Sequence, residues 1–141
     1  MVDKLPISNH VIVCGYGIIG QKIVDVLEEN NVPFIIIDSD ESKVKWIIEK
    51  GFNVVHGDAT ISPTLKNASI SSAKAIAIVM DNDAKDLFTI LTARDLNKDI
   101  FIVTRANDEF LREKLIDAGA DYVTLPQKSA SNQILKEFGL V

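Results

Sequence analysis

Short apolar runs rich in β-branched residues alternate along this chain with stretches in which apolar residues recur every three or four positions. Most of the short runs lack the apolar–polar alternation of a half-exposed strand, so both faces of the predicted strands should be buried. Six strands are predicted, at His10–Cys14, Pro33–Ile37, Asn53–His56, Ala75–Met80, Ile100–Thr104 and Tyr122–Leu125. This pattern indicates an α/β fold, a doubly wound six-stranded parallel sheet with helices on both faces.

Six helices are predicted between and after these strands from the spacing of their apolar residues. The fourth begins near Asp83, and the last runs from about Ser129 to Phe138. Phe88 lies outside the apolar stripe of the fourth helix, so something besides the sheet is expected to cover it. The residues expected to share a helix face are, in chain order, Ile19, Ile23, Val26 and Leu27; Val44, Ile47 and Ile48; Leu65 and Ala68; Leu87, Ile90, Leu91 and Arg94; Leu111, Leu115 and Ala118; and Ile134, Leu135 and Phe138.

A glycine-rich turn joins the first predicted strand to the first predicted helix. It matches the G-x-G-x-x-G pattern of dinucleotide-binding βαβ units and consists of Gly15, Tyr16, Gly17, Ile18, Ile19 and Gly20. In that pattern Gly15 allows the tight turn, Gly17 lets a pyrophosphate approach the backbone, and Gly20 lets the helix pack on the strand. Glycines also cluster in turns that bind nothing, so the loop alone leaves both interpretations open.

An acidic residue follows the second predicted strand at the position that binds ribose in such units. Asp38 stands 18 residues after Gly20, where a carboxylate accepts hydrogen bonds from both ribose hydroxyls and repels a 2′-phosphate. None of residues 39–42 is lysine or arginine, so NADP is the poorest of the candidate ligands. The alternative is that Asp38 only caps the second helix.

Two further polar groups are predicted at the carboxyl edge of the sheet, where open α/β folds bind ligands. Asp58 and Thr60 follow the third strand and could hydrogen-bond an adenine edge or a ribose, with ordinary turn chemistry as the alternative. Arg105 ends the fifth strand and could pair with phosphate oxygens at the glycine loop, or form a surface ion pair.

Other polar residues have structural explanations. Asp81, Asn82, Asp83 and Asp86 open the fourth helix, where carboxylates favour the helix dipole, so capping is predicted for most of this cluster. His56 is interpreted as a strand-end histidine and Cys14 as a buried core residue without an activated thiol. No nucleophile motif or carboxylate pair points to catalysis, so binding without catalytic residues is predicted.

The composition excludes several classes of protein. A chain of 141 residues, 47% hydrophobic and 25% charged, fits one globular domain. Its net charge of −5, without a basic and aromatic window, disfavours nucleic-acid binding. No apolar run approaches the ~20 residues of a membrane span, and Met1–Pro6 lacks the features of a secretion signal, so an intracellular chain is expected. One cysteine and two histidines predict neither an internal disulfide nor a metal site.

Several segments in combination resemble one family far more specifically than the glycine loop alone. They are residues 10–17, which lead into the loop, Asp38, His56-Gly57-Asp58-Ala59-Thr60, and Thr104-Arg105-Ala106-Asn107-Asp108. The sequence resembles an RCK domain, also called KTN or the Trk-type NAD-binding N domain, of potassium channels and transporters. The resemblance continues through residues 118–121 to Pro126 and the last helix, and it covers almost the whole chain.

The resemblance implies a Rossmann-like domain that dimerises through its helices and can build a ring beneath a membrane pore. The last helix, from about residue 127, and Phe88 fit such contacts. NAD(H), ATP, ADP or AMP would bind at the glycine loop and bias the gate of a potassium channel or transporter subunit, fused or separate, at the cytoplasmic face of the membrane. The nucleotide-binding residues it implies are Gly15, Tyr16, Gly17, Ile18, Ile19, Gly20, Asp38, Ser39, Asp58, Ala59 and Arg105.

Three departures from the family pattern matter. Some relatives carry an arginine inside the glycine loop, whereas this chain has Ile18 and Ile19 there. The negative charge of a bound phosphate would therefore be neutralised by backbone amides and Arg105. Calcium-gated members use carboxylates at the ends of the fourth and fifth strands, but here those ends read Val79-Met80 and Thr104-Arg105-Ala106-Asn107, which argues against calcium control at that site. The smaller C-terminal lobe of the family is also absent, so residues 1–141 are expected to form a single domain, either part of a longer protein or a minimal regulator.

Three functions follow as hypotheses. The leading one is a nucleotide-sensing module that regulates potassium transport through a dimer or ring. The second is a fragment of an NAD-dependent oxidoreductase, which would need a hydride-acceptor site that the sequence does not reveal. The third is an oligomerisation scaffold with a vestigial nucleotide site, which Ile18 in the loop keeps open.

Overall fold

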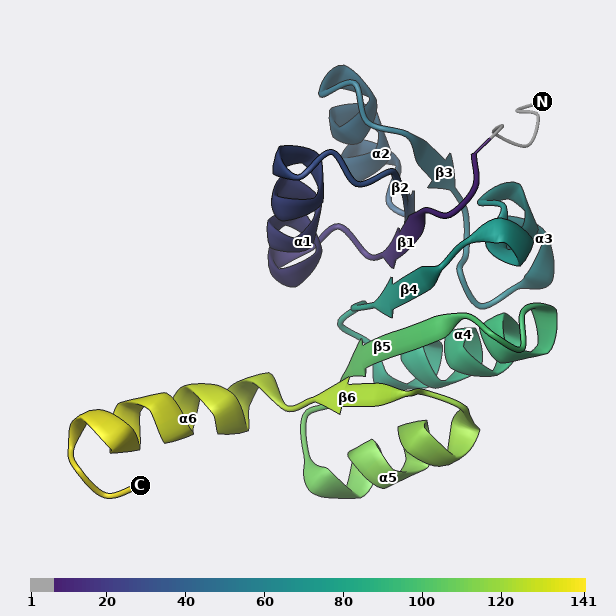
Figure 1. The fold of residues 1–141 in the computed structure, drawn as a ribbon. Coiled ribbons are helices and arrows are strands. Elements are labelled where there is room, and N and C mark those ends of the chain that lie inside the picture. The colour runs from purple at the N-terminus through teal and green to yellow at the C-terminus, as the bar shows by residue number, and fades with distance from the viewer. Residues whose placement is uncertain (1–6) are drawn as a thin grey trace.

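The computed structural model describes residues 7–141, and its elements follow the predicted order of alternating strands and helices (Figure 1). The segment Met1–Pro6, in which no secretion signal is predicted, lies outside the described residues. The elements are β1 (Val11–Cys14), α1 (Ile18–Glu29), β2 (Phe34–Asp38), α2 (Glu41–Glu49), β3 (Val54–His56), α3 (Ser62–Asn67), the 3₁₀ helix η1 (Ile70–Ser72), β4 (Ala75–Ile78), α4 (Asp83–Leu96), β5 (Phe101–Arg105), α5 (Glu109–Ala118), β6 (Tyr122–Thr124) and α6 (Pro126–Glu137).

All six strands are parallel and lie in the order β3-β2-β1-β4-β5-β6. The predicted doubly wound, Rossmann-like sheet is thereby confirmed. The chain runs outward from β1 to one edge and then from β4 to the other, so the strand order reverses between β1 and β4. In open α/β sheets a crevice forms at such a reversal, outside the carboxyl ends of the strands.

Apolar side chains are buried on both faces of the sheet, as the uninterrupted apolar runs predict. On one face Val13 and Ile36 pack with Val24 of α1 and Ile47 of α2. On the other face the strands pack against α3, α4 and α5, and this larger cluster includes Ile12, Cys14, Ile76, Ile78, Leu65, Ile90 and Leu115. Successive residues of one strand therefore face different helix layers.

Three residues predicted to face the sheet are exposed instead, namely Val26 by 43%, Ile48 by 59% and Leu91 by 46%. In α1 the close packing of Gly20 on the glycine loop sets the rotation of the helix, so that Val24, one turn later, is buried. Val26 lies about 200° further round the helix, and Ile48 and Leu91 lie about 100° beyond the buried positions that precede them. The sequence spacing identified the helices correctly, but these three residues stand one or two positions away from buried ones.

Arg94 of α4 is partly buried on the same side of the helix as Ile90, as its spacing predicts, because its guanidinium finds several hydrogen-bond partners there. It donates hydrogen bonds to the carbonyl oxygens of Gly119 and Ile100, both at 2.8 Å, and pairs with Asp121 at 2.9 Å. One side chain thereby ties α4 to the end of α5 and the start of β5. Charge-assisted hydrogen bonds of this kind are stronger than neutral ones.

Two predicted boundaries differ from the structure by two or three residues, whereas the other strand ends differ by at most one. β4 ends at Ile78 rather than at Met80, because its pairing with β1 and β5 stops there and the chain turns toward the glycine loop. The last helix begins at Pro126, earlier than the predicted Ser129, since proline fits the first position of a helix.

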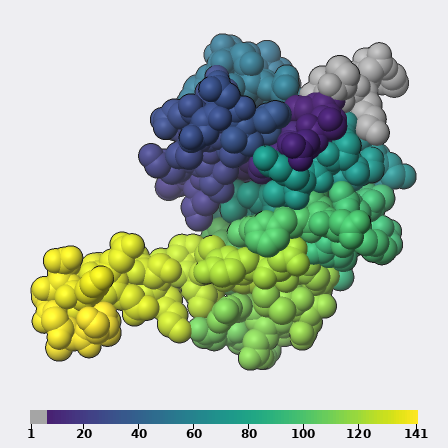
Figure 2. Space-filling model, viewed as in Figure 1, coloured from purple at the N-terminus to yellow at the C-terminus, as the bar shows by residue number. Residues whose placement is uncertain are grey.

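α6 extends away from the body of the domain and has no buried residue (Figures 1 and 2). Ile134 is 58% exposed and Phe138 is 71% exposed, while Phe88 of α4 is 56% exposed. No other part of residues 7–141 covers these apolar side chains, and their predicted role in contacts between copies of the domain stays a prediction. None of the helices in this range combines the length and apolar character that crossing a bilayer requires.

Candidate functional site

Three glycines shape the turn between β1 and α1, and the absence of a side chain has a different effect at each of them. Gly15 has a φ of +101°, which side-chain-bearing residues rarely adopt. A Cβ atom on Gly20 would collide with the carbonyl oxygen of Gly15. A Cβ atom on Gly17 would meet nothing within 4 Å, so its backbone stays open to an approaching group.

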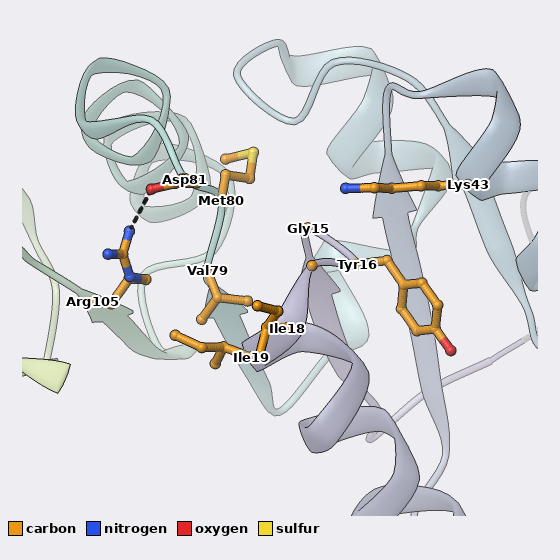
Figure 3. A pocket seen from close by; sticks show the side chains of 10 residues that line it. Gly15, Tyr16, Ile18, Ile19, Lys43, Val79, Met80, Asp81 and Arg105 are labelled. Carbon is orange, nitrogen blue, oxygen red and sulfur yellow. Dashed lines mark hydrogen bonds and ion pairs between the residues drawn. The ribbon is translucent and has the colours of Figure 1, made fainter. Parts of the chain in front are cut away.

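A cavity of about 520 Å³ opens beside this turn, at the carboxyl ends of β1, β4 and β5 (Figure 3). It therefore occupies the crevice at the strand-order reversal, the usual ligand position in this architecture. Six of the predicted residues line it, together with four that the sequence did not single out as ligands. The lining residues are Gly15, Tyr16, Gly17, Ile18, Ile19 and Arg105, then Lys43, Val79, Met80 and Asp81.

Neither Gly20 nor Tyr16 presents a side chain to the cavity, although both belong to the glycine motif. Gly20 does not line the cavity, since it packs behind the loop. The ring of Tyr16 points away from the cavity and packs edge-on against Trp46 at 5.5 Å, so Tyr16 contributes its backbone (Figure 3). Ile18 is 91% exposed at the cavity rim, an unusual position for a large apolar side chain.

Asp38 lies in an adjoining hollow of about 30 Å³ and holds the two loops around it. Its carboxylate accepts hydrogen bonds from the backbone N–H groups of Tyr16 at 2.9 Å and Asp40 at 2.8 Å. The helix cap is Asp40, which accepts from the N–H groups of Ser42 and Lys43. Asp38 is therefore not the capping residue of α2.

The same hollow brings together three other predicted residues, Ser39, Asp58 and Ala59. Asp58 accepts hydrogen bonds from the backbone N–H and the hydroxyl of Thr60, at 2.9 and 2.7 Å, and these bonds lower the pKa of its carboxyl. Gly15 and Met80 line both the hollow and the larger cavity, so the two spaces adjoin.

Arg105 lines the cavity and also forms an ion pair, so features of both predicted roles are present. Its side chain is only 11% exposed, and one guanidinium nitrogen lies 3.5 Å from Asp81, whose side chain is 99% exposed. A second nitrogen donates to Asn107 at 2.7 Å. A ligand anion would meet a cation that already has a fixed position.

Capping is predicted for most of the acidic cluster at the start of α4, and for Asp86 this prediction is wrong. The cap is Asn82, which accepts from the N–H of Lys85 at 2.9 Å, whereas Asp86 is fully buried and neither carboxylate oxygen has a hydrogen-bond partner among the described residues. Burial raises the pKa of Asp86 to about 8, against the opposing influence of Arg105. Its spacing with Ile90 and Ala93, both buried on the same helix, was the available sequence signal.

His56 and Cys14, interpreted from the sequence as structural residues, both contact other parts of the fold. His56 shares a hydrogen bond of 3.1 Å with the carbonyl oxygen of Ser39. Cys14 is fully buried, and burial, followed by the charge of Asp86, raises the pKa of its thiol. Within residues 7–141 no group of three or more histidine, cysteine or acidic side chains could hold a metal ion.

The strand order and a G-x-G-x-x-G loop facing a cavity at the strand-order reversal define a Rossmann-type domain. Residues 11–126 match the family model of the TrkA-N domain. The chain belongs to the TrkA-N domain family, the family that the sequence motifs indicated.

Curated relatives of the chain include two potassium channel proteins of Methanocaldococcus jannaschii. The chain is 41% identical to potassium channel protein 1 over 89% of its own length, and 38% identical to probable potassium channel protein 2 over 85%. It spans only 39% and 36% of those two proteins, respectively.

Solved structures of similar fold include a domain of an inner membrane protein, a channel and the C-terminal domain of a further protein. The TrkA-N domain of YbaL from Escherichia coli has a TM-score of 0.90 at 24% identity, covering 94% of this chain and 98% of that one. The GsuK channel bound to NAD has a TM-score of 0.79 at 25% identity, covering 86% of this chain and 22% of that one. The Kef C-terminal domain of Shewanella denitrificans in an AMP-bound form has a TM-score of 0.78 at 26% identity, covering 94% and 80%.

Proposed function

We propose that this chain is a nucleotide-binding regulatory domain that controls potassium transport through a channel or transporter. One observation carries the proposal: a cavity at the strand-order reversal joins the glycine loop and Arg105, and adjoins the hollow that contains Asp38. A ribose-binding carboxylate, anion-binding amides and a cation in that order fit a phosphorylated nucleoside. The kinship with potassium channel proteins supplies the transport context.

The ligand we propose is NAD(H) or an adenine nucleotide, namely ATP, ADP or AMP. Asp38 would accept hydrogen bonds from the ribose hydroxyls, with Ser39, Asp58 and Ala59 around the adenosine end. Amides at Gly17 and the start of α1, together with Arg105, would bind phosphate. NADP fits poorly, because the Asp38 carboxylate would repel its 2′-phosphate. The AMP-bound Kef domain and the NAD-bound GsuK channel support this ligand class.

Regulation would arise from a difference in nucleotide affinity between two arrangements of associated domains. A ligand shifts such an equilibrium only as far as it binds one state more tightly than the other. The exposed apolar residues of α6 and Phe88 offer surfaces for a homodimer or a ring. We propose that this assembly works on the cytoplasmic side of the membrane, attached to a pore subunit in the same or a separate chain.

We propose a binding function without catalysis. Among the described residues, those that line the cavity include no histidine, cysteine or serine, and the Cys14 thiol is buried in the core. The lining side chains that could exchange a proton with a substrate are Asp81, which is paired with Arg105, and Lys43, which we assign to binding an anion. Turnover of NADH with a small substrate would contradict this part of the proposal.

Selective thermal stabilisation by adenine nucleotides is the expected result of the direct test. At ~100 times its Kd, a ligand that binds only the folded state adds ~2.7 kcal/mol, which corresponds to a rise in Tm of about 5–10 °C for a domain of this size. The measurement is a thermal-shift series with NAD, NADH, NADPH, ATP, ADP and AMP, in which NADPH should shift Tm least. If none of the six changes Tm, the nucleotide-sensing proposal fails and a scaffold function remains.

Asp38→Ala is expected to raise the Kd for AMP at least tenfold, because the ribose hydroxyls lose their acceptor. Asp38 also accepts two backbone N–H groups, so the variant will lose some stability as well. Asp40→Ala is the matched control, since it removes the cap of α2 but lies in neither the cavity nor the hollow. Equal Kd values for the two variants, measured by calorimetry, would exclude Asp38 as the ribose ligand.

A further inference from the structure

Lys43 brings a second cation into the cavity. It belongs to the first turn of α2, is partly buried, and lines the cavity opposite Arg105. Its amine points across the cavity toward Met80, and Arg105 lies on the far side, beyond Met80 and Val79 (Figure 3). The glycine loop is therefore flanked by two positive charges.

The two cations differ in how far the protein already neutralises them. Arg105 is paired with Asp81 and hydrogen-bonded to Asn107. Lys43 has neither an ion pair nor a side-chain hydrogen bond within residues 7–141. In a chain with a net charge of −5, an unpaired ammonium directed into a cavity attracts an anion there.

The sheet places these cations in a definite order relative to the adenosine end. Lys43 follows β2, the strand that ends in Asp38, whereas Arg105 ends β5. β1 and β4 lie between those two strands. A nucleotide whose ribose is at Asp38 would therefore reach Lys43 before the glycine loop and Arg105.

The geometry points to two phosphate subsites of different reach, in which Lys43 binds the phosphate attached to adenosine and Arg105 binds the next phosphate along. This inference rests on the proposed nucleotide function and extends it. A monophosphate uses Lys43 and the loop amides without Arg105, and a diphosphate uses both cations. The ligand class that fills the cavity is an adenosine 5′-diphosphate group, free or as part of a dinucleotide.

Lys43→Met should raise the Kd for both AMP and ADP about tenfold, a loss of about 1.4 kcal/mol, while adenosine affinity stays unchanged. The ratio of the AMP and ADP affinities is then preserved. Arg105→Met should instead weaken ADP about tenfold and change AMP less than about threefold. Titration calorimetry on the full chain measures all three ligands.

Two further variants separate a phosphate contact from a general effect. Lys45→Met removes the same charge from an exposed position of α2 outside the cavity and should leave all three Kd values unchanged. Lys43→Arg keeps the charge and should retain AMP affinity within about threefold. The AMP affinity of Lys43→Met should also depend less on NaCl concentration than that of the unaltered chain.

The outcomes distinguish this inference from the function on which it rests. If the unaltered chain binds no nucleotide, both are overturned. If it binds AMP and ADP but Lys43→Met weakens neither, only the Lys43 subsite is wrong. A loss of adenosine affinity as large as the loss of AMP and ADP affinity would mean that Lys43 does not act on the phosphate and would equally overturn it.

Discussion

Replacing Gly20 by alanine is expected to destabilise the domain strongly and to abolish nucleotide binding. The added Cβ would meet the carbonyl oxygen and carbon of Gly15, which are backbone atoms that cannot rotate away as a side chain can. Either α1 moves off the sheet or the turn deforms, and overpacking of this kind costs about 2–4 kcal/mol. In a domain of this size that loss lowers Tm by roughly 10 °C, measurable by calorimetry or circular dichroism.

Gly17→Ala is the matched control within the same loop. Gly17 has a φ of −89°, which alanine adopts freely, and its Cβ would meet nothing within 4 Å. The free protein should therefore keep its Tm within about 3 °C, while the methyl group intrudes on the cavity and raises nucleotide Kd at least tenfold. If Gly20→Ala proved as stable as Gly17→Ala, the packing explanation for the third glycine would be wrong.

Asp86→Asn is expected to remove a large part of the pH dependence of stability. In the folded protein the pKa of Asp86 lies near 8, whereas its ordinary value is 3.8. Because the folded state holds this proton more tightly than the unfolded state, the contribution of Asp86 to the free energy of unfolding is greatest below about pH 4. That contribution falls as the pH rises toward 8. The stability difference between Asp86→Asn and the unaltered chain should then change in favour of the variant by about 1.4 kcal/mol per pH unit between pH 5 and 8.

Urea unfolding at pH 5, 6, 7, 8 and 9 measures this difference directly. Asp95→Asn is the control, since Asp95 lies on the same helix with its side chain 83% exposed and should leave the pH dependence of the chain unchanged. Above pH 8 the advantage of Asp86→Asn should level off, because Asp86 is then ionised in both states. A difference that stays constant from pH 5 to 9 would mean that Asp86 does not change its ionisation on folding.

The sequence predicted the sheet and the glycine loop because local patterns determine them. Uninterrupted β-branched runs are required for strands buried on both faces, and six such runs became six parallel strands. Gly15, Gly17 and Asp38 were found because their spacing follows from the length of one strand–helix–strand unit. Their roles in ligand binding stay predictions until a nucleotide is tested.

The residues that the sequence missed depend on how helices are rotated on the sheet. Asp86 follows a helix cap, where a carboxylate has an ordinary explanation, and only the packing of α4 shows that it is buried. Lys43 stands one position beyond the segment inspected for cations after Asp38, and the orientation of α2 directs it into the cavity. A shift of one position along a helix turns a side chain by about 100°, which exceeds the precision of a periodicity argument.

Cys14 gives this chain an internal reporter of its own opening. It is the only cysteine, it lies at the end of β1 directly before the glycine loop, and it is fully buried. A thiol reagent can modify it only in molecules whose central strand has separated from its neighbours, so the modification rate measures the rarest, most global fluctuations of the domain. Any ligand that tightens the adjoining turn will slow that reaction, without a label being introduced into the protein.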